Sequence, residues 1–174
     1  MTDAQLIERI KQTSLLRGHF MLRSGRHSNY YIDKYLFETQ PDILSALAAR
    51  LAQHVDPSVD RLAAAELGGI PLVTATALAT GKPCLLIRNQ KKSYATSQQL
   101  EGKLETGDRV VMIEDIATTG GQCLDAAKVL VNGGAEIVKI VAVIDRQEGA
   151  RNNLEAAGFP FASLFTKADL GIDP

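Results

Sequence analysis

Hydrophobic positions along the chain alternate between short unbroken runs and helix-like faces. The runs are four to eight residues long or slightly more, and each ends at glycine, proline or charged residues, which is typical of buried strands. The stretches between them space their apolar residues as helices do and end at glycine. Strands are therefore predicted at 61–66, 82–88, 108–115, 136–146 and 159–165, and helices at 68–81, 120–134 and 148–158. This alternation predicts an α/β fold with a parallel sheet and helices on both faces.

The first 55 residues follow a different pattern. Thr2 and Asp3 precede a short amphipathic stretch and predict a capped first helix. Residues 24–35 are expected to form a turn followed by a strand, and Pro41 is expected to open a helix. The apolar face of that helix would contain Ile43, Leu44, Leu47, Ala48, Leu51 and Val55.

Residues 88–103 show neither the helical nor the strand spacing of apolar residues. They are polar, and basic in their first half. A loop of this length in a small domain is usually functional or disordered.

Composition limits the classes of function. The chain has 174 residues, of which 45% are apolar, and this suits one domain over 1–174. Nineteen basic and 20 acidic residues leave a net charge of −1, which gives no case for nucleic acid or an anionic membrane as partner. The longest uncharged run, 67–81, is broken by Gly68, Gly69 and Pro71 and is too short to span a membrane. With an N-terminus unlike a signal peptide, we expect a cytoplasmic protein.

The cysteines and histidines do not indicate a redox or metal site. Cys84 and Cys123 lack CxxC spacing and are interpreted as free thiols in a reducing compartment, with a disulfide left open. The three histidines show no ligand spacing and are expected to be surface or packing residues; they are His19, His27 and His54.

The stretch VMIEDIATTGG, residues 111–121, combines two acids with a turn rich in threonine and glycine. Ligands of open α/β sheets bind at the carboxyl ends of strands, and the N–H groups that begin the next helix attract anions. A phosphorylated sugar satisfies both halves, because its hydroxyls can donate to Glu114 and Asp115 while its phosphate sits in the turn. The alternative is an ordinary strand-to-helix turn with capping threonines and solvated acids. The chain has neither a Walker A loop nor GxGxxG.

This stretch resembles the phosphoribosyl-pyrophosphate (PRPP) motif of type I phosphoribosyltransferases. The resemblance implies that Glu114 and Asp115 hold the ribose hydroxyls. It also implies that the turn holds the 5-phosphate through Ile116, Ala117, Thr118, Thr119, Gly120, Gly121 and Gln122.

Further segments, from about residue 15 to residue 170, resemble the orotate phosphoribosyltransferases. They include LLRGHFMLRSGRHSNYYIDK, ELGGIPLVTATALATGKPCLLIR and AVIDRQEGARNNLEAAGFPFASLFTKADL. In ELGG, the resemblance implies that Gly68 and Gly69 let the backbone approach pyrophosphate, although a plain helix start would use the same residues.

The same resemblance implies an orotate site made by Arg23, Tyr30, Tyr31, Thr118 and Arg146. An anionic planar ring suits aromatic faces and a guanidinium that can pair with its carboxylate. Two alternatives stay open at this point. The tyrosines could be alternating strand residues with one buried, and Arg146 could simply pair with Asp145 or Glu148.

For the polar loop, the resemblance implies a mobile catalytic segment that closes over PRPP with Arg88, Lys91, Lys92 and Tyr94. Lys92 and Asp115 would then be the catalytic residues. Three positions depart from the usual pattern of the family. Tyr94 stands where histidine is common, Asn89 stands where lysine is usual, and Ala95 stands where glycine is usual.

The implied fold is that of type I phosphoribosyltransferases, with a small N-terminal hood over about residues 1–40. The implied reaction transfers the phosphoribosyl group from PRPP to orotate, giving orotidine 5′-monophosphate and pyrophosphate, in pyrimidine biosynthesis. Mg²⁺ is implied as cofactor, held by PRPP and water with no direct protein ligand. A homodimer whose subunits exchange the loop is also implied. Two alternatives are a transferase for a purine base and a regulator on the same fold that senses PRPP or nucleotides.

Overall fold

A six-stranded sheet forms the centre of the protein in a computed structural model that describes residues 1–21, 25, 27–89 and 99–172. Its strand order is β5-β4-β3-β6-β7-β8. All neighbouring strands are parallel except β4 and β5, which are antiparallel. The strands are β3 (Arg61–Ala65), β4 (Cys84–Ile87), β5 (Leu100–Glu101), β6 (Arg109–Ala117), β7 (Glu136–Asp145) and β8 (Phe161–Thr166).

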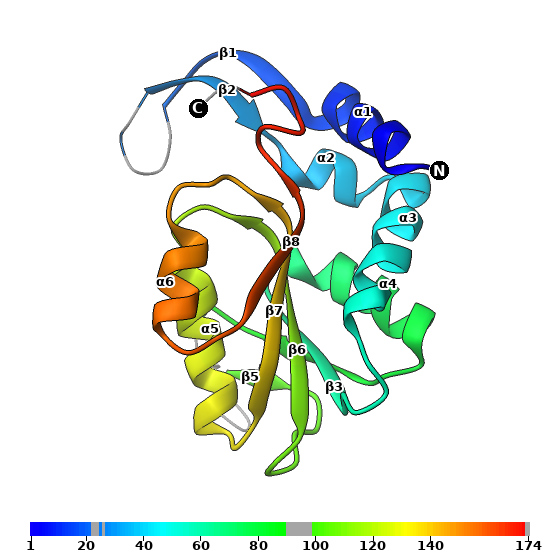
Figure 1. Ribbon diagram of the computed structural model, residues 1–174, viewed down its shortest axis with the longest axis vertical. Helices are drawn as coiled ribbons and strands as arrows, with labels where there is room; N and C mark the ends of the chain where they lie inside the picture. The colour runs from blue at the N-terminus through cyan, green and yellow to red at the C-terminus, as the bar shows by residue number, and fades with distance from the viewer. Residues whose placement is uncertain (22–24, 26, 90–98, 173–174) are drawn as a thin grey trace.

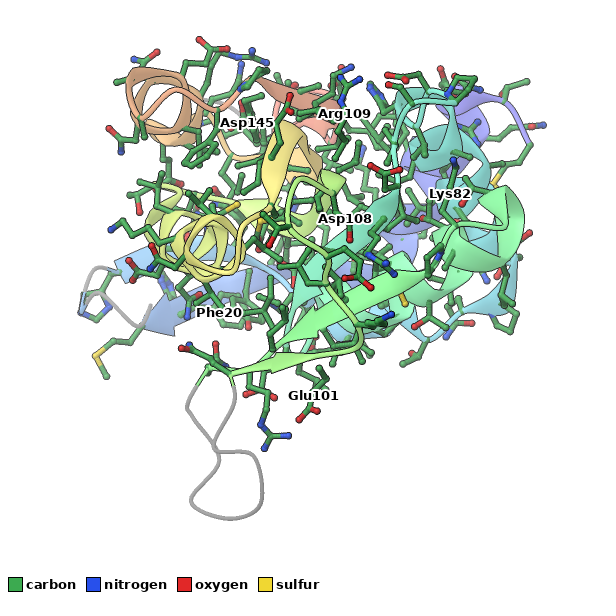
Figure 2. All side chains as sticks on the ribbon, turned by 90° about the horizontal axis from the view of Figure 1, so that it is seen from below. Phe20, Lys82, Glu101, Asp108, Arg109 and Asp145 are labelled. Carbon is green, nitrogen blue, oxygen red and sulfur yellow. The ribbon has the colours of Figure 1, made fainter. Side chains whose placement is uncertain are left out.

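The predicted parallel sheet is thus confirmed for five strands. The short edge strand β5 corrects the prediction that 88–103 is loop throughout, because Leu100 and Glu101 pair with Ile87 and Leu86. Glu101 lies at this outer edge of the sheet (Figure 2). A two-residue strand is too short for alternation to show in sequence.

Helices cover both faces of the sheet, as the sequence predicts (Figure 1). On one side lie α3 (Pro41–Leu51) and α4 (Gly69–Thr80), and on the other α5 (Gly121–Asn132) and α6 (Ala150–Ala156). Strand β6 shows why both faces are apolar: Val111 and Ile113 join one buried cluster, while Val110 and Met112 join the other. Successive strand residues point to opposite faces, so a doubly covered strand is apolar throughout.

The N-terminal segment forms a hood above the sheet (Figure 1). It contains α1 (Asp3–Ser14), β1 (Leu15–Met21), β2 (His27–Ile32) and α2 (Lys34–Glu38), with β1 and β2 antiparallel. The predicted first helix and the strand in 24–35 are confirmed, whereas β1 and α2 were not foreseen. The hood also receives the C-terminal segment, because Leu170 and Ile172 belong to the same buried cluster as Leu6 and Ile10.

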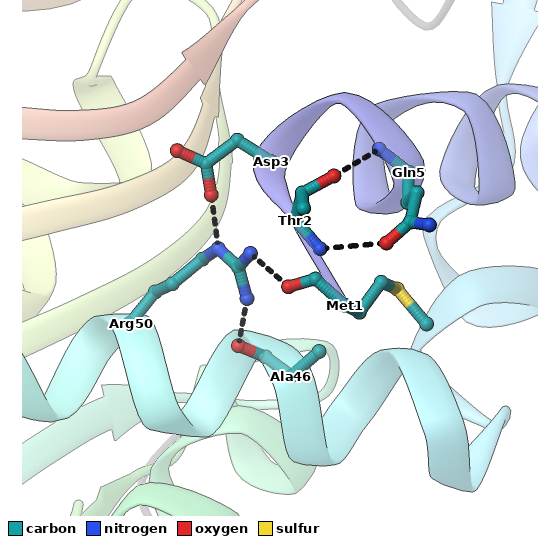
Figure 3. Close-up of polar contacts among 6 residues, drawn as sticks. All are labelled: Met1, Thr2, Asp3, Gln5, Ala46 and Arg50. Carbon is teal, nitrogen blue, oxygen red and sulfur yellow. Dashed lines mark hydrogen bonds and ion pairs between the residues drawn. The ribbon is translucent and has the colours of Figure 1, made fainter.

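Helix α1 is held on α3 by the N-terminal residues (Figure 3). Thr2 and Gln5 form a capping box, in which each side chain accepts from the other's backbone N–H. Arg50 of α3 donates from Nε to Asp3 at 2.6 Å and also donates to the carbonyls of Met1 and Ala46. These contacts fix the hood against the helix layer of the sheet.

Other predicted boundaries differ by a few residues. Helix α3 ends at Leu51 and a 3-10 turn, Ala52–His54, follows it, so Val55 lies beyond the helix. Strand β6 is longer than predicted and ends at Ala117. Both cysteines are free, with Cys123 buried. His19 and His27 are exposed and His54 is half-buried. Within the described part of the chain, no helix has the length and apolar character needed to cross a membrane.

Candidate active site

The two acids of the motif lie where β6 continues past its pairing with β3. Pairing between these strands stops at Ile113 and Ala64, whereas β6 continues along β7 as far as Ala117. Glu114 and Asp115 therefore lie within the strand rather than at its end, but beyond the last residue pair that β6 forms with β3. One edge of β6 is open there, which places both carboxyls at the rim of the sheet where ligands bind.

Glu114 and the turn after β6 line one pocket of about 90 Å³. The other lining residues are all those from 116 to 123, so the structure brings together Glu114 and the whole predicted phosphate turn. Asp115 does not line this pocket. Its side chain is only 5% exposed and points into the protein.

The turn from β6 into α5 is arranged to leave its N–H groups outward. Gly120 caps α5 with a φ of 81°, in the left-handed region that favours glycine. The carbonyl of Thr118 accepts from the N–H of Ala150 at 3.1 Å, and that of Thr119 accepts from Asn153 Nδ2 at 2.8 Å. The carbonyls thus face α6, and the first N–H groups of α5, which have no intrahelical acceptor, remain for an anion.

Glu114 and Asp115 form a coupled acid pair. Their side chains are in hydrogen-bond contact, and the Glu114 carboxyl also contacts the thiol of Cys123. Burial raises the pKa of Glu114, and the charge of Asp115 raises it further. Burial and the charge of Glu114 likewise raise the pKa of the Cys123 thiol. We therefore expect Glu114 to carry a proton near neutral pH.

Asp115 is held by a lysine that the sequence did not single out. Lys34 of α2 donates to Oδ2 of Asp115 at 2.6 Å, and the N–H of Ile116 donates to Oδ1. Burial lowers the pKa of Lys34, but the charge of Asp115 and its hydrogen bond outweigh burial and raise the pKa above its ordinary value. No motif marks Lys34, because its partner is 81 positions away.

Glu38, also on α2, is a second acid that the sequence did not single out. Its side chain is 1% exposed, and neither carboxyl oxygen has a hydrogen-bond partner. Burial, followed by the charge of Asp115, raises its pKa to about 8.

Gly68, in the predicted pyrophosphate loop, contacts both of these acids. A Cβ at this position would lie 2.0 Å from Oδ2 of Asp115 and 3.1 Å from Oε1 of Glu38. Its φ of −66° is open to any residue, so glycine is needed here for space and not for conformation. A Cβ on Gly69 would meet that of Ala64 at 2.7 Å. Both glycines allow the start of α4 to lie against the sheet.

Arg146 follows β7 and reaches into the hood. It donates from Nη2 to the hydroxyl of Tyr30 at 2.9 Å, and its Cζ lies 5.3 Å from the centre of the Tyr30 ring. The same Nη2 lies 2.9 Å from Oε1 of Glu148, so the ion pair considered as an alternative is present. Nε of Arg146 is buried and has no partner, which leaves one donor of the guanidinium free.

The structure separates the two predicted tyrosines. Tyr30 is half-buried beside Arg146, whereas Tyr31 is 42% exposed and packs on Phe20 with ring centres 5.8 Å apart. Alternation along β2 therefore brings Tyr30 to Arg146 and directs Tyr31 to the other face of the hairpin. The role of Tyr31 stays a prediction.

Arg88 lies at the base of the polar segment. Its N–H donates to the carbonyl of Gln99 at 2.8 Å, and its guanidinium lies 3.7 Å from Glu101. Asn89 donates from its N–H to Glu66 at 2.7 Å, which ties this base to the loop before α4. Four other predicted site residues lie outside the described residues; they are Arg23, Lys91, Lys92 and Tyr94.

Comparison with known proteins agrees with this geometry. The phosphoribosyl transferase domain family matches residues 37–159. Orotate phosphoribosyltransferase of Natronomonas pharaonis is 41% identical over 174 residues, covering 99% of each chain. The Halobacterium salinarum enzyme of that name is 46% identical over 153 residues, covering 88% of this chain and 87% of the relative.

Among solved structures, Mycobacterium tuberculosis orotate phosphoribosyltransferase in complex with PRPP superposes with a TM-score of 0.79. It is 30% identical and covers 97% of this chain and 98% of its own. The pocket formed by the turn after β6, and the similarity over nearly the whole length, lead to one conclusion: the chain belongs to the phosphoribosyl transferase domain family and, within it, to the orotate phosphoribosyltransferases.

Proposed function

We propose that this protein transfers the phosphoribosyl group of PRPP to orotate, releasing pyrophosphate and forming orotidine 5′-monophosphate for pyrimidine synthesis. One observation carries the proposal. The backbone N–H of Arg146 donates to the carbonyl of Ala117 at 2.9 Å, so the guanidinium begins beside the phosphate turn. A site for a phosphorylated sugar and a site for an anionic base thus meet on two adjacent strands.

The residues suggest a division of labour between the two substrates. The N–H groups at the start of α5 bind the 5-phosphate, and the acid pair Glu114–Asp115 accepts from the ribose hydroxyls. Arg146 pairs with the orotate carboxylate through its guanidinium, exchanging its contact with Glu148.

The chemical step breaks the bond between C1 of the ribose and pyrophosphate. Positive charge develops on the ribose as this bond lengthens, and the negative charge on the acid pair stabilises it. The ring nitrogen of orotate forms the new bond to C1 and releases its proton to water as pyrophosphate leaves. Catalysis then depends mainly on positioning and on charge stabilisation of the departing pyrophosphate.

Magnesium is the proposed cofactor. Both oxygens of Asp115 are engaged within the protein, one by Lys34 and the other by the N–H of Ile116. The chain therefore fits an ion held by PRPP oxygens and water, which would neutralise part of the pyrophosphate charge.

The assembly is also a proposal. We infer a homodimer in which residues 88–103 of each subunit serve the partner's site, with Lys92 stabilising pyrophosphate. The antiparallel pair β4–β5 supports this, because it carries the segment at the outer edge of the sheet. The two free thiols support a reducing compartment, and we propose the cytoplasm.

A base-selection assay tests the proposed function. Protein, Mg²⁺ and PRPP are mixed with orotate, uracil, adenine, hypoxanthine or xanthine, and pyrophosphate release is followed. Of the five bases, we expect only orotate to cause pyrophosphate release. Release with a purine instead would identify a different transferase, and PRPP binding without release on any base would identify a regulator.

A further inference from the structure

A buried charge cluster connects the hood to the acid pair. Lys34 and Glu38 lie one helical turn apart on α2 and both face Asp115 of β6. Gly68, before α4, closes the cluster from the third side, since a Cβ there would overlap Oδ2 of Asp115. Segments from the hood, the sheet and the helix layer therefore meet at one carboxylate.

The Asp115 carboxylate has little freedom inside this cluster. Lys34 holds one oxygen at 2.6 Å, the N–H of Ile116 holds the other, and the Gly68 backbone blocks movement toward α4. Of these contacts, only the one from Lys34 carries a full charge. Its loss would leave a carboxylate that is 5% exposed without any cation among the described residues that contact it.

Charge balance makes this single cation important. Among the described residues, three carboxyls, those of Glu38, Glu114 and Asp115, share the site with one ammonium, so only one can be ionised at low cost. Lys34 selects Asp115, because it contacts Asp115 directly while both oxygens of Glu38 lack any partner. The raised pKa values of Glu38 and Glu114 agree with this distribution. The other titratable groups that act on these residues are Asp33, Tyr35 and Cys123.

Building on the proposed phosphoribosyl transfer, we propose that Lys34 is a positioning residue that keeps one negative charge on the acid pair Glu114–Asp115. It acts through Asp115 and does not itself contact the substrate. Without it, the Asp115 carboxylate would lose the one cation among the described residues that contacts it, and its negative charge would no longer be held in place opposite the positive charge that develops on the ribose. PRPP turnover depends on this charge, whereas the orotate contacts of Arg146 do not.

The test is a double-mutant cycle in the full-length protein. Lys34→Met, Asp115→Asn and the double variant are compared with wild type for kcat/KM of PRPP, KM of orotate and PRPP affinity by calorimetry. Lys34→Met should lower kcat/KM for PRPP by roughly tenfold or more and leave the KM of orotate nearly unchanged. In the Asp115→Asn background the same change should have an effect of about twofold or less, because Lys34 acts through the missing charge.

Two further variants separate charge from packing. Lys34→Arg keeps the charge and should restore part of the loss. Lys128→Met removes an exposed lysine 3.3 Å from Asp125 and should match wild type.

Two results would overturn the inference: equal losses in both backgrounds, or tighter PRPP binding by Lys34→Met. Tighter binding would mean that the Lys34 side chain occupies space that PRPP needs. Wild type is assayed in parallel for orotate-dependent transfer. Its inactivity would overturn the proposed function, while the calorimetric cycle would still decide the coupling of Lys34 to Asp115.

Discussion

Nη2 of Arg146 lies 2.9 Å from the hydroxyl of Tyr30, which joins two residues 116 positions apart in the chain. Tyr30 belongs to the hood and Arg146 to the end of the central sheet, so this contact spans the entrance to the proposed base site. It also keeps the guanidinium in one place before a substrate arrives, and such preorganisation reduces the entropy lost on binding.

Arg146→Ala should therefore weaken orotate binding far more than PRPP binding. The expected loss is about 2 kcal/mol or more, roughly 30-fold, because a charged hydrogen-bond partner is removed from a partly buried site. Calorimetry with each substrate measures it. Equal losses for both substrates would make Arg146 a structural residue.

Tyr30→Phe removes only the hydroxyl that Arg146 contacts. We expect orotate affinity to fall by about 1 kcal/mol, since one hydrogen bond that orients the guanidinium is lost. Tyr31→Phe is the matched control, because its ring lies on the other face of the hairpin against Phe20. An effect of Tyr31→Phe as large as that of Tyr30→Phe would contradict this assignment.

Gly68→Ala should reduce PRPP turnover sharply. The new methyl group would lie 2.0 Å from Oδ2 of Asp115, so either the carboxylate or the loop must move. We expect a stability loss of about 1–3 kcal/mol together with a lower kcat/KM for PRPP. Gly18→Ala is the control, because the nearest atoms to its Cβ would be 3.4 Å away. Full activity of Gly68→Ala would show that Asp115 need not stay in this position.

Glu38 should make the protein less stable as pH rises. Its folded pKa of about 8 exceeds the ordinary value of 4.5, so between these values the folded chain holds a proton that the unfolded chain has lost. Stability from this group is complete below the lower value and is lost toward the higher, with a slope on the order of 1 kcal/mol per pH unit.

Glu38→Gln should remove this contribution. Urea unfolding at about pH 5 and about pH 8 should show a smaller difference for the variant than for wild type. The exposed carboxyl of Glu105 offers a control, Glu105→Gln, that should leave the difference unchanged. Identical pH profiles for Glu38→Gln and wild type would mean that Glu38 is already ionised in the folded protein.

The proposed sharing of residues 88–103 predicts complementation between two inactive chains. A Lys92→Ala chain mixed with an Asp115→Asn chain should recover part of the activity, because one site of each heterodimer then carries neither change. Native mass spectrometry confirms heterodimer formation. An inactive mixture that contains heterodimers would rule out loop sharing, and a monomer at micromolar concentration would rule out the dimer.

Local patterns predicted the parts of the site that lie close together in the chain. The run from Glu114 to Gln122 was found because an apolar strand, two acids and a glycine turn follow one another. Lys34 and Glu38 were missed for the opposite reason. They lie on a five-residue helix that is too short to show a period, and their importance comes from burial beside Asp115. Only the folded chain shows that contact.

Strand β5 and the end of β6 illustrate the same limit at the level of the fold. Leu100 and Glu101 pair at the sheet edge because Ile87 and Leu86 offer free backbone groups there. No alternation of polar and apolar residues predicts this strand. Strand β6 extends beyond Asp115 to Ala117 because β7 continues beside it, and the charge of the acids hides this continuation in the sequence.

The most direct test of the account is the stoichiometry of the products. Wild-type protein with Mg²⁺, PRPP and orotate should form orotidine 5′-monophosphate and pyrophosphate in equal amounts, measured by chromatography of one reaction. Omission of either substrate should abolish both products. Pyrophosphate formed without orotidine 5′-monophosphate, or neither product formed from a folded protein that binds PRPP, would contradict phosphoribosyl transfer to orotate.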